Sequence, residues 1–98
     1  MIIAYPISQV ADLLAELCDA GFHVDLGSNV EEISNKGWRK LLTCHNTQVW
    51  ARLFPQFDAD HIFLRVDQSS TTDAKTIVDV IILGGGWDAE WWLWGKIQ

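Results

Sequence analysis

Hydrophobic residues near the N-terminus recur with the spacing of an amphipathic helix. They stand at i, i+3, i+4, i+7 and i+8, the stripe that packs one helix face onto a core: Val10, Leu13, Leu14, Leu17 and Cys18. Ser8 precedes this stripe as a suitable N-cap, and Gly21 follows it, where a glycine in the left-handed conformation commonly ends a helix. We therefore predict a helix over about residues 8–20, with Cys18 as a small buried thiol on its apolar face.

Apolar runs and alternating residues predict strands on both sides of this helix. Residues 2–5 form a short apolar strand that Pro6 ends, because proline has no backbone N–H to donate to a neighbouring strand. Residues 22–26 and 61–66 alternate between apolar and polar side chains. Each of these two segments is therefore expected to be a strand with one buried face.

The segment 38–54 allows two interpretations. It can form two strands, residues 38–44 and 48–54, joined through residues 45–47, or one helix with its apolar residues at Leu41, Leu42, His45, Val49 and Leu53. We favour the hairpin because the segment contains a set of weak helix formers: Thr43, Asn46, Thr47, Val49 and Trp50.

The last third of the chain is predicted to add two more strands. Residues 67–75 form a polar loop, and residues 76–83 are almost all β-branched or apolar, as in a strand buried on both faces. Three glycines, 84–86, supply a hairpin turn before a final strand over residues 90–97.

A short second helix completes the expected elements. Ser28 to Glu31 fits a capping box, so we predict this helix over about residues 29–36, with Gly37 ending it. The fold class is therefore α+β, a mostly antiparallel sheet with the helices on one face, in one domain that spans residues 1–98.

The charge of the chain is unevenly distributed. The net charge is −6, from 13 acidic and 7 basic residues. Residues 1–35 hold six acids and no lysine or arginine: Asp12, Glu16, Asp19, Asp25, Glu31 and Glu32. In residues 36–98 the acids and bases cancel. The first three acids fall at i, i+4 and i+7 on the solvent face of the predicted helix. We therefore expect no direct nucleic-acid binding, because such binding depends on Lys and Arg that neutralise phosphates.

No apolar stretch approaches the ~20 residues that span a bilayer, and the N-terminus lacks the basic start of a signal peptide. We therefore expect a cytoplasmic protein without membrane contact, in which Cys18 and Cys44 stay reduced.

Catalytic and metal-binding patterns are weak. The glycines at 84–86 are not followed by the pattern of a phosphate-binding loop, and the histidines and cysteines lack paired ligand spacing. We expect no cofactor, no metal and no catalytic site. A small cofactor-free enzyme is the alternative, with His23 and Asp25 as an acid–base pair on one strand face and Cys44 as a nucleophile; Asp60 and His61 are a second adjacent pair.

Four of the six tryptophans lie within residues 87–94. On a strand, Trp92 and Trp94 would share one face, either in the core or in an interface. Two functions would use an exposed face: a homodimer through the C-terminal strand, or a Trp-lined site for a small molecule or carbohydrate.

The leading hypothesis is a small acidic protein-binding module. It would act as an inhibitor that docks a basic, for example nucleic-acid-binding, surface of a partner protein, by analogy with immunity proteins and phage counter-defence proteins. The partner-binding residues are predicted to be the six N-terminal acids and two of the tryptophans: Asp12, Glu16, Asp19, Asp25, Glu31, Glu32, Trp92 and Trp94.

Overall fold

Five antiparallel strands form one sheet in the computed structural model, which describes residues 1–24, 37–44, 47–67 and 72–97. The strands lie in the order β2-β3-β4-β1-β5. Their bounds are β1 Ile2–Pro6, β2 Arg39–Cys44, β3 Thr47–Phe54, β4 Asp58–Val66 and β5 Trp87–Asp88. The N-terminal strand is therefore internal, between the long β4 and the short edge strand β5.

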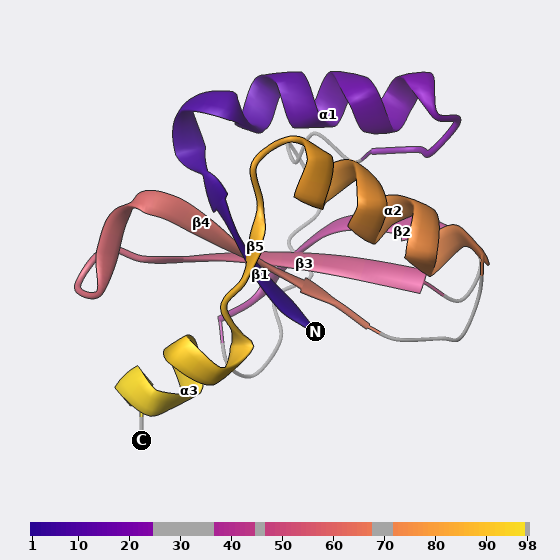
Figure 1. Ribbon diagram of the computed structural model, residues 1–98. Helices are drawn as coiled ribbons and strands as arrows, with labels where there is room; N and C mark the ends of the chain where they lie inside the picture. Colours follow the sequence, from indigo (N-terminus) through magenta and orange to yellow (C-terminus); the bar gives the residue numbers. More distant parts are fainter. Residues whose placement is uncertain (25–36, 45–46, 68–71, 98) are drawn as a thin grey trace.

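Helices cover both faces of this sheet. A 3-10 turn, Ile7–Gln9, leads into α1 (Val10–Asp19), and α1 lies with α2 (Thr72–Leu83) on one face, whereas α3 (Glu90–Ile97) lies on the other (Figure 1). The α+β class is confirmed, but the prediction that the helices share one face is wrong.

Alternation along the strands divides the core in two. In β1, Ile3 and Tyr5 point toward α1 and α2, while Ile2 and Ala4 point toward α3. The α1/α2 side is aliphatic apart from Tyr5 and Phe22, and the α3 side is rich in aromatic rings: Trp38, Trp50, Phe54 and Phe63. This alternation places Tyr5 beneath the helix that carries the acidic residues.

The predicted helix near the N-terminus is present, with its C-terminal end as expected. Gly21 has φ 93°, the N–H of Phe22 donates to the carbonyl oxygen of Leu17 (3.0 Å), and the N–H of Gly21 donates to that of Cys18 (3.0 Å). These two hydrogen bonds form a Schellman motif, in which glycine accepts the left-handed conformation without a Cβ clash.

Two details of this helix were predicted wrongly. Ser8 lies inside the 3-10 turn, and α1 begins after Gln9 with no side-chain cap. Cys18 is exposed. It stands about 100° around the helix from Leu17, because an α-helix has about 3.6 residues per turn, and that rotation carries it off the buried stripe.

Residues 72–83 form the helix α2, not a polar loop followed by a strand. Ala74, Ile77 and Ile81 are buried at i, i+3 and i+7, so the segment carries a helical stripe within its β-branched composition. The glycines that follow do not make a hairpin turn. Gly85 has φ 109° and Gly86 donates to the carbonyl oxygen of Ile81 (2.9 Å), so the triplet ends the helix.

Residues 90–97 form the helix α3, not a last strand. The chain has already contributed its edge strand at β5, where the carboxylate of Asp88 accepts a hydrogen bond from the N–H of Glu90 (3.1 Å) and turns the chain into the helix. Ala89 and Leu93, both 0 % exposed, then pack on the sheet. The homodimer predicted through a C-terminal strand therefore loses its structural basis.

Two further predictions concern the middle of the chain. The hairpin interpretation of residues 38–54 is confirmed by the antiparallel pairing of β2 with β3. Phe22 and Val24 are buried around the exposed His23 as the alternation predicts, but residues 22–24 form only an isolated bridge from Val24 to Leu42 and not a strand. Residues 25 and 26 lie outside the described residues. The predicted helix over about 29–36 lies outside the described residues. No helix among the residues described is long and apolar enough to cross a bilayer.

Candidate functional site

The solvent face of α1 carries three of the predicted partner-binding residues. Asp12, Glu16 and Asp19 are all exposed, one helical turn apart. None of the ion pairs within the described part of the chain involves any of them. Their negative charge is therefore not paired with a basic side chain among those residues.

Three basic residues of β2, β3 and β4 lie on the opposite face of the sheet, whereas Arg39 of β2 pairs with Ala51 and lies on the α1/α2 side. The Nζ atom of Lys40 is 5.2 Å from the ring centroid of Trp50, and the guanidinium carbon of Arg65 is 5.3 Å from the same centroid. The guanidinium carbon of Arg52 is 4.4 Å from the centroid of Phe54. Both rings belong to the core on the α3 side. The sheet thus separates these three cations from the carboxylates of α1.

A groove of about 370 Å³ lies between α1 and the C-terminal end of α2. Its lining combines two carboxylates, polar groups and aliphatic side chains: Tyr5, Gln9, Asp12, Leu13, Glu16, Val80, Leu83 and Gly84. Two of the acidic residues of α1 therefore form one wall of a concave surface, and the third, Asp19, lies outside it.

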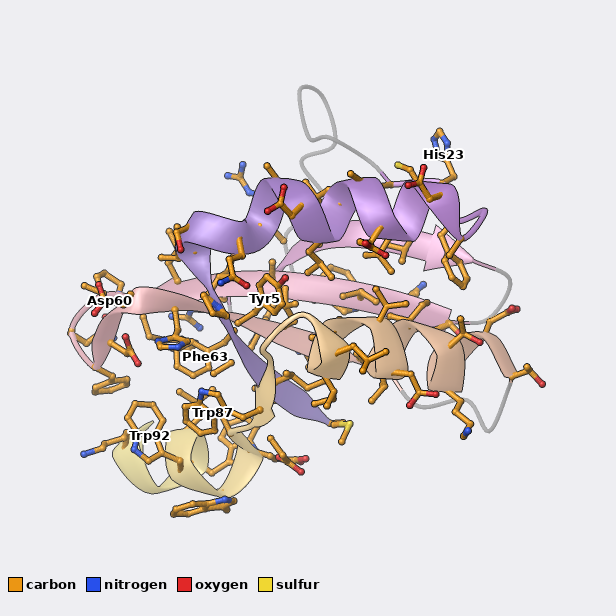
Figure 2. The ribbon with its side chains drawn as sticks, turned by 45° about the horizontal axis from the view of Figure 1, so that its top comes forward. Tyr5, His23, Asp60, Phe63, Trp87 and Trp92 are labelled. Atoms are coloured by element: carbon orange, nitrogen blue, oxygen red, sulfur yellow. The ribbon has the colours of Figure 1, made fainter. Side chains whose placement is uncertain are left out.

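Tyr5 brings a polar group into this groove. Its side chain is 2 % exposed and lies under α1 (Figure 2), yet its hydroxyl makes no hydrogen bond within the described residues. The pKa of Tyr5 is raised above its ordinary value, first by burial and then by the negative charges of Asp12 and Glu16. A Cβ atom at Gly84 would come within 2.6 Å of the hydroxyl oxygen, so glycine is needed where α2 ends against the phenol.

The two predicted tryptophans lie far from this acidic face. Trp92 stacks on Phe63 beside α3, with ring centroids 5.8 Å apart and an interplanar angle of 9°, on the other side of the sheet from Tyr5 (Figure 2). The Nζ atom of Lys96 lies 5.4 Å from the centroid of Trp92, and Trp94 packs half-buried against the same cluster. Both rings therefore fill the core, and Trp92 has little free face for a stacked ligand.

The remaining predicted acids, Asp25, Glu31 and Glu32, lie outside the described residues. The structure thus brings Asp12, Glu16 and Asp19 together and separates them from Trp92 and Trp94.

Sequence reasoning missed the groove residues Tyr5 and Leu83 and the exposed ring of Trp91. Leu83 is 87 % exposed and Trp91 is 75 % exposed. Tyr5 could have been found, because alternation in β1 places it on the face that α1 covers. Leu83 and Trp91 could not have been found in this way, because residues 76–83 and 90–97 were predicted to be strands. A strand places side chains on its faces with a period of two, whereas these segments are helices with a period of 3.6.

Two pairs of a histidine and a carboxylate were considered as acid–base groups, namely Asp60 with His61 and His23 with Asp25. The pKa of Asp58 is lowered, chiefly because its carboxylate accepts a hydrogen bond from the N–H of Asp60 (2.9 Å), with His61 adding to the effect. Nδ1 of His61 lies 3.0 Å from Oδ2 of Asp58, so the contact that the structure shows for His61 is with Asp58 and not with its neighbour Asp60. His23 is exposed, and its predicted partner Asp25 is not described.

No group of three His, Cys, Asp or Glu side chains that could hold a metal ion is found in the ranges that the structure describes. Comparison with protein-family models, with curated proteins and with solved structures finds no match to this chain. What the acidic face and its groove can bind therefore follows from their chemistry alone.

Proposed function

We propose that this protein is a binding module whose acidic α1 face docks onto a basic surface of a partner protein. One observation carries the proposal. Asp12, Glu16 and Asp19 are exposed on one helix face and form no ion pair within the described residues, while Lys40, Arg52 and Arg65 lie across the sheet. The sheet therefore keeps these three cations away from the α1 carboxylates, while Arg39 and Lys75 lie on the α1/α2 side.

Such an arrangement suits association better than folding. Neighbouring like charges one turn apart cost a helix about 0.2–0.5 kcal/mol per pair, and the burial of Leu13 and Leu17 beneath α1 offsets that cost. An unneutralised field speeds encounter with an oppositely charged surface and disfavours acidic ones. Three carboxylates spaced over about 10 Å of helix present this field to a partner.

Inhibition of a nucleic-acid-binding protein is the form of this function that we favour. Proteins of that class carry the Lys and Arg clusters that phosphates require, and an acidic face can occupy them. We further propose a cytoplasmic setting, in which the exposed thiol of Cys18 stays reduced.

Charge reversal tests the proposal. The variant Asp12→Lys, Glu16→Lys, Asp19→Lys is compared with a control that reverses three acids on other elements: Asp60→Lys, Asp79→Lys, Glu90→Lys. Each set changes the net charge from −6 to 0, since each acid replaced by lysine adds two. Wild type and control should capture the same partner from a native-like lysate, and the α1 variant should not.

Salt provides the second arm of this experiment. Capture should weaken between about 0.1 M and about 1 M salt, where the screening length falls from about 10 Å to about 3 Å. Equal capture by the α1 variant and the wild type would contradict the proposal.

A further inference from the structure

The groove beside α1 has two chemically different walls. Asp12 and Glu16 stand on the α1 wall, and Val80 and Leu83 on the α2 wall. Leu83 is 87 % exposed, so its side chain is available to cover an apolar ligand segment. At about 370 Å³, the space lies at the small end of the ~300–1,000 Å³ typical of ligand pockets, which suits a single side chain.

Tyr5 lines the groove and its hydroxyl has no hydrogen-bond partner in the described part of the chain. Its side chain is 98 % buried, being 2 % exposed. The fully buried side-chain atoms without a hydrogen-bond partner in the described residues are Nδ1 of His61 and Nε of Arg65, so the Tyr5 hydroxyl oxygen is accessible from the groove that Tyr5 lines. The hydroxyl of a tyrosine whose ring is buried usually finds a hydrogen-bond partner. A ligand group in the groove would supply that partner.

The charge of the groove selects the ligand. Asp12 and Glu16 repel anions and attract a cation, and their Cβ atoms, four residues apart, lie about 5–6 Å from each other on a helix surface. A guanidinium group presents five N–H donors in one plane, enough to reach two carboxylates and the phenol oxygen together. The aliphatic wall of Val80 and Leu83 fits the methylene stem that carries such a group.

We propose that this groove is an anchor site for the arginine side chain of a partner protein. The guanidinium lies between the carboxylates of Asp12 and Glu16 and donates to the hydroxyl oxygen of Tyr5, while the stem contacts Leu83. This inference rests on the proposed docking function and assigns the residue that the partner inserts.

Binding of a minimal probe tests the site directly. Nα-acetyl-arginine amide is titrated into the wild-type protein, and binding is monitored by NMR through the backbone amide resonances of residues that line the groove. The citrulline counterpart serves as an uncharged probe of nearly the same shape. The arginine derivative should shift the resonances of Glu16 and Gly84 in a saturable way, and the citrulline derivative should not. Equal shifts from both probes, or shifts from neither, would overturn the proposal.

Variants separate the groove from the general acidic field. Tyr5→Phe keeps the ring and should weaken arginine binding about fivefold, the effect of one lost hydrogen bond. Asp12→Asn with Glu16→Gln should weaken it more than about tenfold, because both charged acceptors are lost. Asp19→Asn lies outside the groove and should change it less than about twofold.

Thermal unfolding checks that each of these variants is folded. If Tyr5→Phe does not fold, the surface pair Asp12→Asn, Glu16→Gln still decides the outcome. Unchanged binding of the arginine derivative to that double variant would overturn the assignment of the site.

Failure of the groove and failure of docking are distinguishable. Loss of partner capture in the triple charge reversal, together with no arginine binding, would leave docking intact and remove the anchor site. Arginine binding together with undiminished partner capture in the reversal would mean that the groove takes free guanidinium compounds, which overturns its assignment to a partner's side chain.

Discussion

Tyr5 is the residue at which the fold and the acidic face meet. It is the only tyrosine in the chain, it packs in the aliphatic core beneath α1, and its hydroxyl reaches the groove beside Asp12 and Glu16. Burial and the two carboxylates both disfavour the phenolate, so its pKa is raised. A single ionisable ring therefore reports the electrostatic field of the proposed site.

Stability should fall at high pH through this residue. A group whose folded-state pKa lies above its unfolded value of about 10 contributes stability that is fully present below pH 10 and is lost as the pH rises toward the folded pKa. We expect the free energy of unfolding, measured with urea between about pH 9 and about pH 11, to decline less in Tyr5→Phe than in the wild type. Parallel declines would contradict the raised pKa of Tyr5.

The acidic neighbours should control the same ionisation. Tyrosinate absorbance arises from Tyr5 alone, so a spectroscopic titration gives its pKa directly. Asp12→Asn with Glu16→Gln should lower that pKa, whereas Asp79→Asn on the exposed side of α2 should leave it unchanged. A pKa that does not respond to the first pair would show that Tyr5 does not sense the α1 carboxylates.

At the scale of the elements, periodicity predicted what a single stripe or a clear alternation determines. The helix at 8–20 was predictable from its single apolar stripe. The hairpin of β2 and β3 was predictable from its weak helix formers, because its apolar spacing allowed both a helix and two strands. Residues 72–83 were assigned to a loop and strand on their β-branched content, although β and helix propensities span only about 1 kcal/mol and packing overrides them. The helical stripe of Ala74, Ile77 and Ile81 was present in the sequence, and it decided the structure.

The C-terminal helix could not be predicted by the same means. Glu90–Ile97 has tryptophans on several sides, so neither a period of two nor one of 3.6 stands out. The position of this segment follows from the pairing of β5 with β1, a contact between residues more than eighty positions apart in the chain. The candidate site was half predictable: the acids of α1 followed from spacing, but the groove required α2 to be a helix.

Two glycine substitutions test these element assignments. Gly86→Ala should destabilise the protein by about 1–3 kcal/mol, because the new Cβ would lie 2.8 Å from Ile3, Ile81 and the Ile81 carbonyl oxygen. Gly95→Ala meets nothing within 4 Å and lies inside α3, so it should stabilise by about 0.5–1 kcal/mol. Urea denaturation measures both, and a destabilising Gly95→Ala would argue against the C-terminal helix.

At the scale of the whole molecule, the sheet separates the α1 carboxylates from the cations that stack on aromatic rings. Figure 1 shows α1 on one face of the sheet and α3 on the other. The three carboxylates of α1 are exposed on the first face, and three cations lie beside aromatic rings on the second. Charge separated in this way orients a small protein as it approaches a charged partner. Docking should therefore involve α1 and leave α3 exposed.

The exposed thiol of Cys18 on α1 provides the most direct measurement of which face docks. In a Cys44→Ser background, the rate of Cys18 alkylation is compared between the free protein and its complex with the captured partner. A second variant moves the thiol to α3, with Cys18→Ser and Trp91→Cys at a position that is 75 % exposed. We predict that the partner slows alkylation strongly at Cys18 and leaves Trp91→Cys unaffected; protection at the α3 thiol with an unchanged rate at Cys18 would contradict docking through the acidic face.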